Sequence, residues 1–136
     1  MAEHVQERCE PGDEVDRLAN RVIGAAIEVH KHLGPGFAEA VYEESLCVEL
    51  ELRGIPFIRQ APFDVVFKFR TVGEGRVDIL VDNMLVVELK AVESLAPVHK
   101  AQVRSYLKAT GCKLGLLFNF NTPWLREGAI KRIILS

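Results

Sequence analysis

The chain has 136 residues, 49% of them hydrophobic and 26% charged, which is typical of one globular domain that can bury a core. The formal net charge of −2 excludes a basic field over the whole molecule, so nucleic-acid binding would need a local patch or metal ions. Three widely spaced cysteines form no CxxC pair, which excludes a zinc ribbon or a disulfide framework and favours a reduced, cytoplasmic protein. We expect no signal peptide and no membrane helix, because the N-terminus is polar and no apolar run approaches about 18 residues.

The first half of the chain predicts a tail and two helices. Residues 1–14 are polar and are expected to form a disordered tail before a single domain over residues 15–136. From Asp16, apolar residues at three- and four-residue spacings predict a helix that ends at Gly34. A second helix is predicted from about Ala38 to Leu52. Its inner face is expected to carry Val41, Tyr42, Ser45, Val48 and Leu52.

Apolar runs in the second half predict strands, with one more helix between them. Pro97 opens this helix, which is predicted at about residues 98–110 and ends at Gly111. The strands are predicted at about residues 57–60 with 63–69, 75–81, 85–91, 113–121 and 129–135. The resulting order, α-α-β-β-β-α-β-β, predicts an α/β (α+β) fold in which helices pack on a sheet.

Residues 76–90 form the most informative stretch, because they read as two apolar strands joined by a tight Asp-Asn turn. Three ionisable residues interrupt the apolar pattern: Asp78 in the first strand, and Glu88 and Lys90 in the second. Residues two apart project from one face of a strand, so Glu88 and Lys90 share a face. The apolar neighbours indicate a buried strand, where desolvating a carboxylate costs roughly several kcal/mol unless it is compensated. These charges therefore indicate a functional site.

The loop between these two strands decides whether Asp78 and Glu88 share a face. A two-residue loop at 82–83 would oppose Asp78 to Val87, and the two carboxylates would then point to opposite sides of the sheet. A shared site requires a three- or five-residue loop, or a bulge that shifts the register by one residue. A three-residue loop over 82–84 meets this requirement.

An acid on one strand, followed by Glu-x-Lys on the next, suits metal-assisted phosphodiester hydrolysis. Two carboxylates supply the hard oxygen ligands that hold one or two divalent ions. The metal polarises the phosphate and generates hydroxide from water. A lysine two residues from the glutamate can orient the water or offset charge that develops on the phosphate.

The sequence also resembles a known family. Asp78 with Glu88-Leu89-Lys90 resembles the signature of the PD-(D/E)XK nuclease superfamily, although Val77 stands where the superfamily's name has proline. Residues 36–42, Gly-Phe-Ala-Glu-Ala-Val-Tyr, are similar to the motif that names the GxxExxY proteins, a branch of that superfamily. Residues 102–106 resemble the Gln-x-x-x-Tyr motif of the RecB-like nucleases. The resemblance runs from about residue 22 to residue 135.

The resemblance implies a restriction-endonuclease-like core, with a central mixed sheet flanked by helices. We expect a metal-dependent nuclease that hydrolyses phosphodiester bonds, with DNA favoured over RNA as the substrate. The resemblance also implies Mg²⁺ or Mn²⁺ bound by three acids and one main-chain carbonyl, which are Glu39, Asp78, Glu88 and Leu89. Lys90 would be the catalytic lysine. Gln102 and Tyr106, one helical turn apart, would reach the same site and contact substrate or support Lys90.

Several of these residues also have ordinary explanations. Glu88 and Lys90 could be a solvated pair on an edge strand, and Glu39 could be an acid that the helix dipole favours near an N-terminus. Glu28 is a rival ligand, but it lies off the apolar stripe of its helix. Tyr42 is expected to be a packing residue with a polar tip.

Residues of the third predicted helix also have both a functional and an ordinary explanation, and the function itself has alternatives. Gln102 and Tyr106 could be ordinary surface and core residues of an amphipathic helix. Arg104 and Lys108 lie one turn apart and could contact phosphates or form a solvated face. The alternatives to a nuclease are a non-catalytic nucleic-acid- or protein-binding module, such as a subunit of a larger complex, and a structural homodimer.

Overall fold

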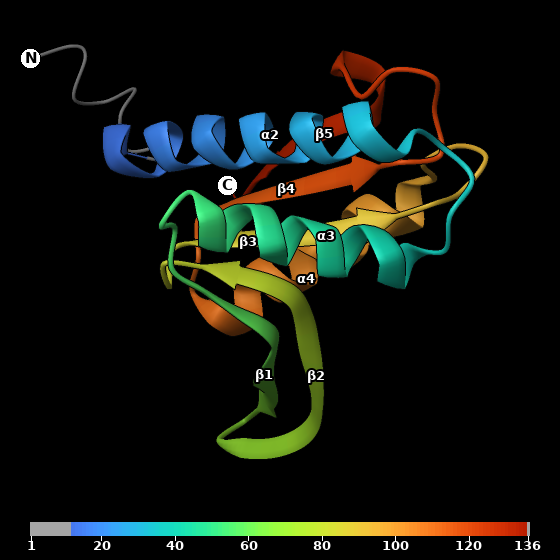
Figure 1. The fold of residues 1–136 in the computed structure, drawn as a ribbon. Helices are drawn as coiled ribbons and strands as arrows, with labels where there is room; N and C mark the ends of the chain where they lie inside the picture. Colours follow the sequence, from blue (N-terminus) through green and yellow to red (C-terminus); the bar gives the residue numbers. More distant parts are fainter. Residues whose placement is uncertain (1–11, 136) are drawn as a thin grey trace, which may run out of the picture.

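The computed structural model describes residues 12–135, so residues 1–11 of the expected tail lie outside the described part (Figure 1). The first helix begins at Asp13, three residues before the predicted start. The helices are α2 (Asp13–Leu33), α3 (Glu39–Leu52) and α4 (Pro97–Thr110), with a short 3₁₀ turn, η1 (Glu127–Ala129). The strands are β1 (Phe57–Phe67), β2 (Arg70–Val81), β3 (Leu85–Lys90), β4 (Leu114–Asn119) and β5 (Ile130–Ile134).

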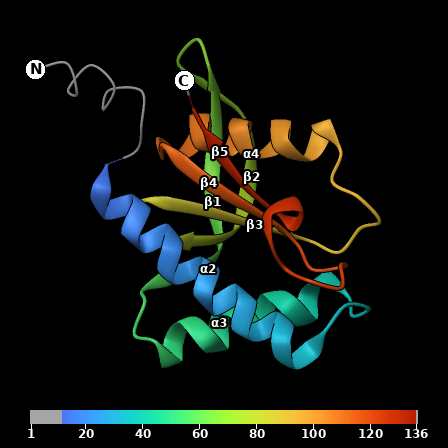
Figure 2. The same cartoon turned by 90° about the horizontal axis from the view of Figure 1, so that it is seen from above.

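The five strands form one sheet in the order β1-β2-β3-β4-β5. The β3–β4 pair is parallel and the other pairs are antiparallel, so the sheet is mixed. Helices α2 and α3 lie against one face and α4 against the other (Figure 2). The predicted element order and the sheet flanked by helices are confirmed. No helix within residues 12–135 is both long enough and apolar enough to span a membrane.

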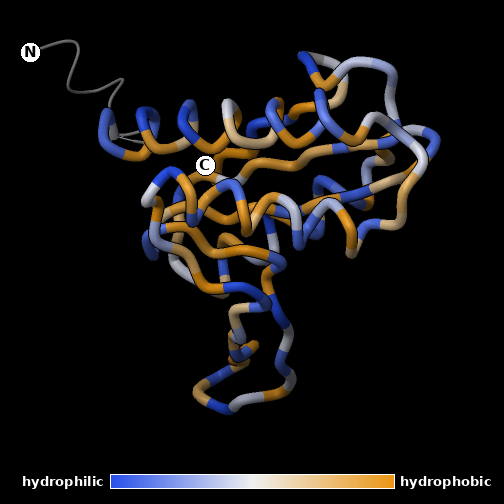
Figure 3. Tube along the Cα trace, in the orientation of Figure 1, coloured by the Kyte–Doolittle hydropathy of each residue, from blue (hydrophilic) through white to orange (hydrophobic). Residues whose placement is uncertain are grey.

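Strand β3 lies at the centre of this sheet and contributes side chains to the hydrophobic clusters on both of its faces. Leu85, Val87 and Leu89 pack towards α2 and α3, whereas Val86 packs in the cluster that α4 covers. Because side chains alternate along a strand, Glu88 and Lys90 project on the α4 side with Val86. In Figure 3 the outer side of α2 is polar and its inner side apolar, as an amphipathic helix over a sheet requires.

Helix α3 buries a different face from the one that the sequence predicted. Its buried residues are Tyr42, Glu43, Leu46, Cys47 and Leu50. Val48 is 49% exposed and Leu52 is 77% exposed, so the predicted inner face was wrong apart from Tyr42. The rotation brings the carboxylate of Glu43 inward.

The β2–β3 loop has the length that a shared site requires. Val81 pairs with Leu85 and Ile79 with Val87, which leaves three residues, 82–84, in the loop. Asp82 and Asn83 adopt positive φ values of 50° and 56°, in the left-handed region that Asn and Asp tolerate best among non-glycine residues. The predicted three-residue loop with Val81 opposite Leu85 is confirmed. The ladder ends at Ile79–Val87, and Asp78 and Glu88 are the next residues along the two strands.

Strands β1 and β2 form a long hairpin that projects beyond the rest of the sheet (Figure 1). The two runs predicted at 57–60 and 63–69 are one strand, which ends at Phe67. Gln60 has a φ of 53° within this strand, so the backbone is irregular at the position that lies beside Asp78. This irregularity directs the Gln60 side chain towards the residues discussed below.

Gly115 of β4 tests how tightly α4 is seated on the sheet. A Cβ atom at this position would lie 2.6 Å from Val103 Cγ1 of α4. We expect Gly115→Ala to destabilise the protein by about 1–3 kcal/mol, the usual cost of overpacking a core, as measured by urea unfolding. Gly73→Ala is the control, because its Cβ would meet only Val65 Cβ at 4.0 Å. Equal stability of the two variants would show that α4 shifts without cost.

Candidate active site

The carboxylates of Asp78 and Glu88 each accept a main-chain N–H from the opposite strand at the point where the β2–β3 ladder ends. The Asp78 N–H donates to Glu88 Oε1 at 2.8 Å, and the Leu89 N–H donates to Asp78 Oδ2 at 3.0 Å. Two side-chain carboxylates therefore continue the hydrogen bonding beyond the Ile79–Val87 pair. This exchange fixes both carboxyl groups side by side between the strands.

Burial and mutual repulsion make both carboxyl groups reluctant to ionise. Glu88 is 3% exposed, and burial, followed by the charge of Asp78, raises its pKa from 4.5 to about 8. Burial also raises the pKa of Asp78, and the charge of Glu43 adds to that rise against the hydrogen bond from Leu89. The pair carries its full negative charge at neutral pH only if a cation joins it.

Lys90 supplies positive charge to this pair without being bound to it. Burial raises the pKa of both carboxyl groups, and the charge of Lys90 lowers it, which places the ammonium group within electrostatic reach. Lys90 forms no ion pair within 4 Å to a carboxylate in the described part of the chain. Since β3 has neighbours on both sides and Glu88 is buried, the alternative of a solvated pair on an edge strand is excluded.

Glu39 lies beside this site but not inside it. It is exposed at the start of α3, and its Oε2 accepts a hydrogen bond from the Ala91 N–H at 3.2 Å. Ala91 directly follows Lys90, so Glu39 is anchored at the end of β3. Within residues 12–135, no three His, Cys, Asp or Glu side chains converge closely enough to hold a metal. The three-acid ligand set therefore stays a prediction.

Glu43, which the sequence did not single out, is the acid of α3 that faces inward. Gln60 Nε2 donates to both of its oxygens, at 3.1 and 2.9 Å, and Arg59 Nε donates to Oε2 at 2.6 Å. The same Gln60 nitrogen lies 3.5 Å from Asp78 Oδ1. One hydrogen-bonded chain thus connects Glu43 with Asp78. The only sequence signal for Glu43 is its position one helical turn after Glu39.

Helix α4 brings Tyr106 towards the same pair of carboxylates. Burial raises the pKa of Tyr106, the charges of Glu88 and Asp78 add to the rise, and a hydrogen bond from Gln102 lowers it. The Tyr106 ring packs against Phe63 of β1, with centroids 5.0 Å apart. Tyr106 therefore lies within electrostatic reach of Asp78 and Glu88, whereas the functional roles of Gln102 and Tyr106 stay predictions.

The remaining predicted residues lie away from the carboxylate pair. Arg104 and Lys108 are exposed on α4, and Lys108 lines a groove of about 620 Å³ between α4 and the β1–β2 hairpin. Glu28 Oε2 lies 3.4 Å from His32 Nδ1 on its own helix, so the rival ligand contacts another partner. Tyr42 is fully buried: its hydroxyl donates to the Gly34 carbonyl at 2.5 Å and its ring stacks on Phe120. As expected, Tyr42 packs.

The chain belongs to the PD-(D/E)XK nuclease superfamily, whose family model matches residues 16–133. This match covers every helix and strand apart from the first residues of α2 and the last residue of β5. No curated protein and no solved structure shows a significant match. Members of the superfamily generally hydrolyse phosphodiester bonds, so the chain has a nuclease-like fold and a nucleic-acid substrate class.

The raised pKa of Glu88 predicts how stability depends on pH. The unfolded chain loses this proton near pH 4.5 and the folded protein near pH 8, so without metal the free energy of unfolding falls as pH rises between these values. Glu88→Gln keeps an oxygen for the Asp78 N–H and stays neutral. We expect the variant to match the wild type at pH 5 and to exceed its stability at pH 8 by on the order of 2–4 kcal/mol.

Urea unfolding in EDTA at the two pH values measures this difference. Glu51→Gln, which removes an exposed acid from the end of α3, is the control and should match the wild type at both. A Glu88→Gln variant that is less stable than the wild type at pH 8 would contradict the prediction, because Glu88 would then be a stabilising ion-pair partner.

Proposed function

We propose that this protein is a metal-dependent nuclease of the GxxExxY branch that hydrolyses phosphodiester bonds in DNA. The observation that carries the proposal is the buried Asp78–Glu88 pair, whose carboxylates repel each other next to Lys90. A chain gains no stability from such a pair without a cation, so folding alone does not explain why it is present.

The residues present fit a hard divalent ion. Asp78 and Glu88 would hold Mg²⁺ or Mn²⁺ through oxygen atoms, and Glu39 and the Leu89 carbonyl are the further ligands that we propose. Positive charge at this point relieves the repulsion that raises the pKa of Glu88. When bound, such an ion would polarise the phosphate of the substrate and lower the pKa of a water molecule.

The chain's own residues position and stabilise the reacting phosphate. Lys90, on the same face of β3 as Glu88, holds positive charge where negative charge develops during hydrolysis. Tyr106 would donate a hydrogen bond to substrate, since a phenol keeps its proton at neutral pH and burial raises its pKa further. Gln102 orients the Tyr106 hydroxyl. Arg104 and Lys108 extend the contact along α4 to neighbouring phosphates.

Asp78→Asn tests the metal site. The variant keeps an oxygen to accept the Leu89 N–H but removes one ligand charge, so we expect Mg²⁺ affinity to fall by more than about tenfold. Isothermal titration calorimetry measures this, and the amide resonance of Leu89 should shift with Mg²⁺ in the wild type only. Glu51→Gln is the control. Identical Mg²⁺ binding by wild type and Asp78→Asn would remove Asp78 from the site.

Lys90→Met separates metal binding from hydrolysis. A charged lysine is no metal ligand, so Mg²⁺ affinity should be kept, whereas the cleavage rate of a DNA substrate should fall by about 10²–10³-fold. Lys113→Met, an exposed lysine at the other end of β4, is the matched control. Full activity of Lys90→Met would exclude the lysine from the mechanism. A wild type that binds DNA but cleaves nothing would favour a non-catalytic binding module.

A further inference from the structure

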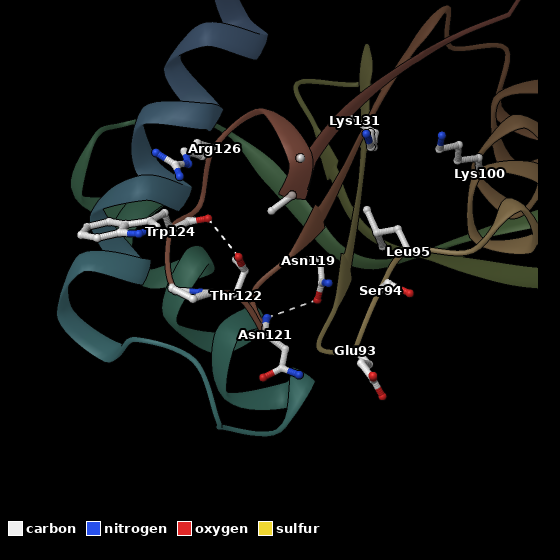
Figure 4. A pocket seen from close by; sticks show the side chains of 13 residues that line it. Glu93, Ser94, Leu95, Lys100, Asn119, Asn121, Thr122, Trp124, Arg126 and Lys131 are labelled. Carbon is white, nitrogen blue, oxygen red and sulfur yellow. Dashed lines mark hydrogen bonds between the residues drawn. The ribbon is translucent and has the colours of Figure 1, made fainter.

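A second site lies at the ends of β4 and β5, next to the one described above. It is a pocket of about 580 Å³ whose lining includes three basic residues, Lys100 of α4, Arg126 and Lys131 of β5. Glu93 is the one acid among its described lining residues. In Figure 4, Lys100 and Lys131 come from different elements and lie on one side of the pocket, whereas Arg126 and Trp124 lie on the other. A protein with a net charge of −2 thus has three of its basic residues around one pocket.

The sheet places this pocket beside the Asp78–Glu88 pair. Glu88 of β3 pairs with Leu117 of β4, which in turn pairs with Lys131 of β5, so Glu88 and Lys131 lie in one row on the same face. Two strand spacings separate them, which is about 10 Å. A single extended ligand of a few nucleotides can therefore reach both places.

The loop after β3 also connects the two places through hydrogen bonds. Asn119, which lines the pocket, pairs with Lys90 in the parallel β3–β4 register. Its side chain accepts from the Val92 N–H at 3.1 Å and donates to the Val92 carbonyl at 2.9 Å. The preceding residue, Ala91, donates to Glu39. Neighbouring residues of one short loop thus contact the acid of α3 and the wall of the pocket.

The rim of the pocket carries an exposed aromatic ring. Trp124 is the only tryptophan in the sequence and is 66% exposed. The guanidinium carbon of Arg126 lies 6.0 Å from its ring centroid. An exposed indole contributes little to folding, whereas bases stack on such rings and cations hold the phosphates between them. The two lysines favour nucleic acid over a protein partner, because lysine is depleted in protein interfaces.

We propose that this pocket binds the substrate strand next to the metal site, with a phosphate between Lys100 and Lys131 and an unpaired base on Trp124. The assignment to substrate rests on the proposed nuclease function. The ligand class is single-stranded nucleic acid, or a single-stranded end of a duplex, because a base can stack on the ring only when it is unpaired.

Trp124 fluorescence tests the proposal on the full-length protein without metal. A short single-stranded DNA should quench the emission of the wild type. In the double variant Lys100→Ala/Lys131→Ala, the slope of log affinity against log salt should fall by about 1.4, or roughly 0.7 for each lost phosphate contact. Lys113→Ala should keep the wild-type slope. Circular dichroism shows whether each variant is folded, and Lys100→Gln/Lys131→Gln replaces the double variant if it is not.

The outcomes separate this proposal from the nuclease function. An unchanged slope and unchanged quenching in the double variant overturn the second site, while loss of cleavage in Lys90→Met keeps the nuclease. Conversely, a wild type that cleaves nothing with Mg²⁺ or Mn²⁺, while only the double variant loses binding, supports the second site without a nuclease. Inorganic phosphate that competes as well as the oligonucleotide, at equal phosphate concentration, overturns the assignment to a strand.

Discussion

The exchange of hydrogen bonds between Asp78 and Glu88 is the constraint on which the rest of the site depends. Each carboxylate accepts a main-chain N–H from the partner strand, so neither can turn away without leaving a buried donor unsatisfied. The exchange also requires one register, because a shift of one residue would send the acids to opposite faces. The three-residue loop over 82–84 provides that register, and its cost is two non-glycine residues at positive φ.

The sequence correctly predicted the features that follow from the alternation of side chains along a strand and from the residues typical of turns. A strand that keeps Glu88 and Lys90 two residues apart has one geometry, so their shared face followed from spacing alone. The three-residue loop followed only from the further requirement that Asp78 and Glu88 share a site. The orientation of α3 did not, because the segment 39–52 contains two apolar stripes and its sequence does not distinguish them. Choosing the stripe with Val48 and Leu52 turned Glu43 outward and concealed its contact with Gln60.

The basic residues around the pocket could not be assigned to one site from the sequence, because the order of the strands brings them together. Lys100, Arg126 and Lys131 lie far apart in the sequence, among acids that lower the net charge to −2. Only the antiparallel return of β5 beside β4 brings Lys131 to the α4 side, where Lys100 lies in the first turn of the helix. A net charge therefore says little about a local field, and its low value did not argue against a basic pocket.

The two acids of α3 have different freedom to join an ion at Asp78 and Glu88. Glu43 is 9% exposed and is bound by Arg59 and Gln60 at 2.6–3.1 Å, so moving it would break charge-assisted bonds and leave Arg59 without this partner. Glu39 is exposed and held by one bond of 3.2 Å to Ala91, so a change of rotamer costs little. Glu43 thus keeps a negative charge near Asp78, and this charge raises the pKa of Asp78 further. Of the two, Glu39 is therefore the acid whose freedom fits the third-ligand role that we propose.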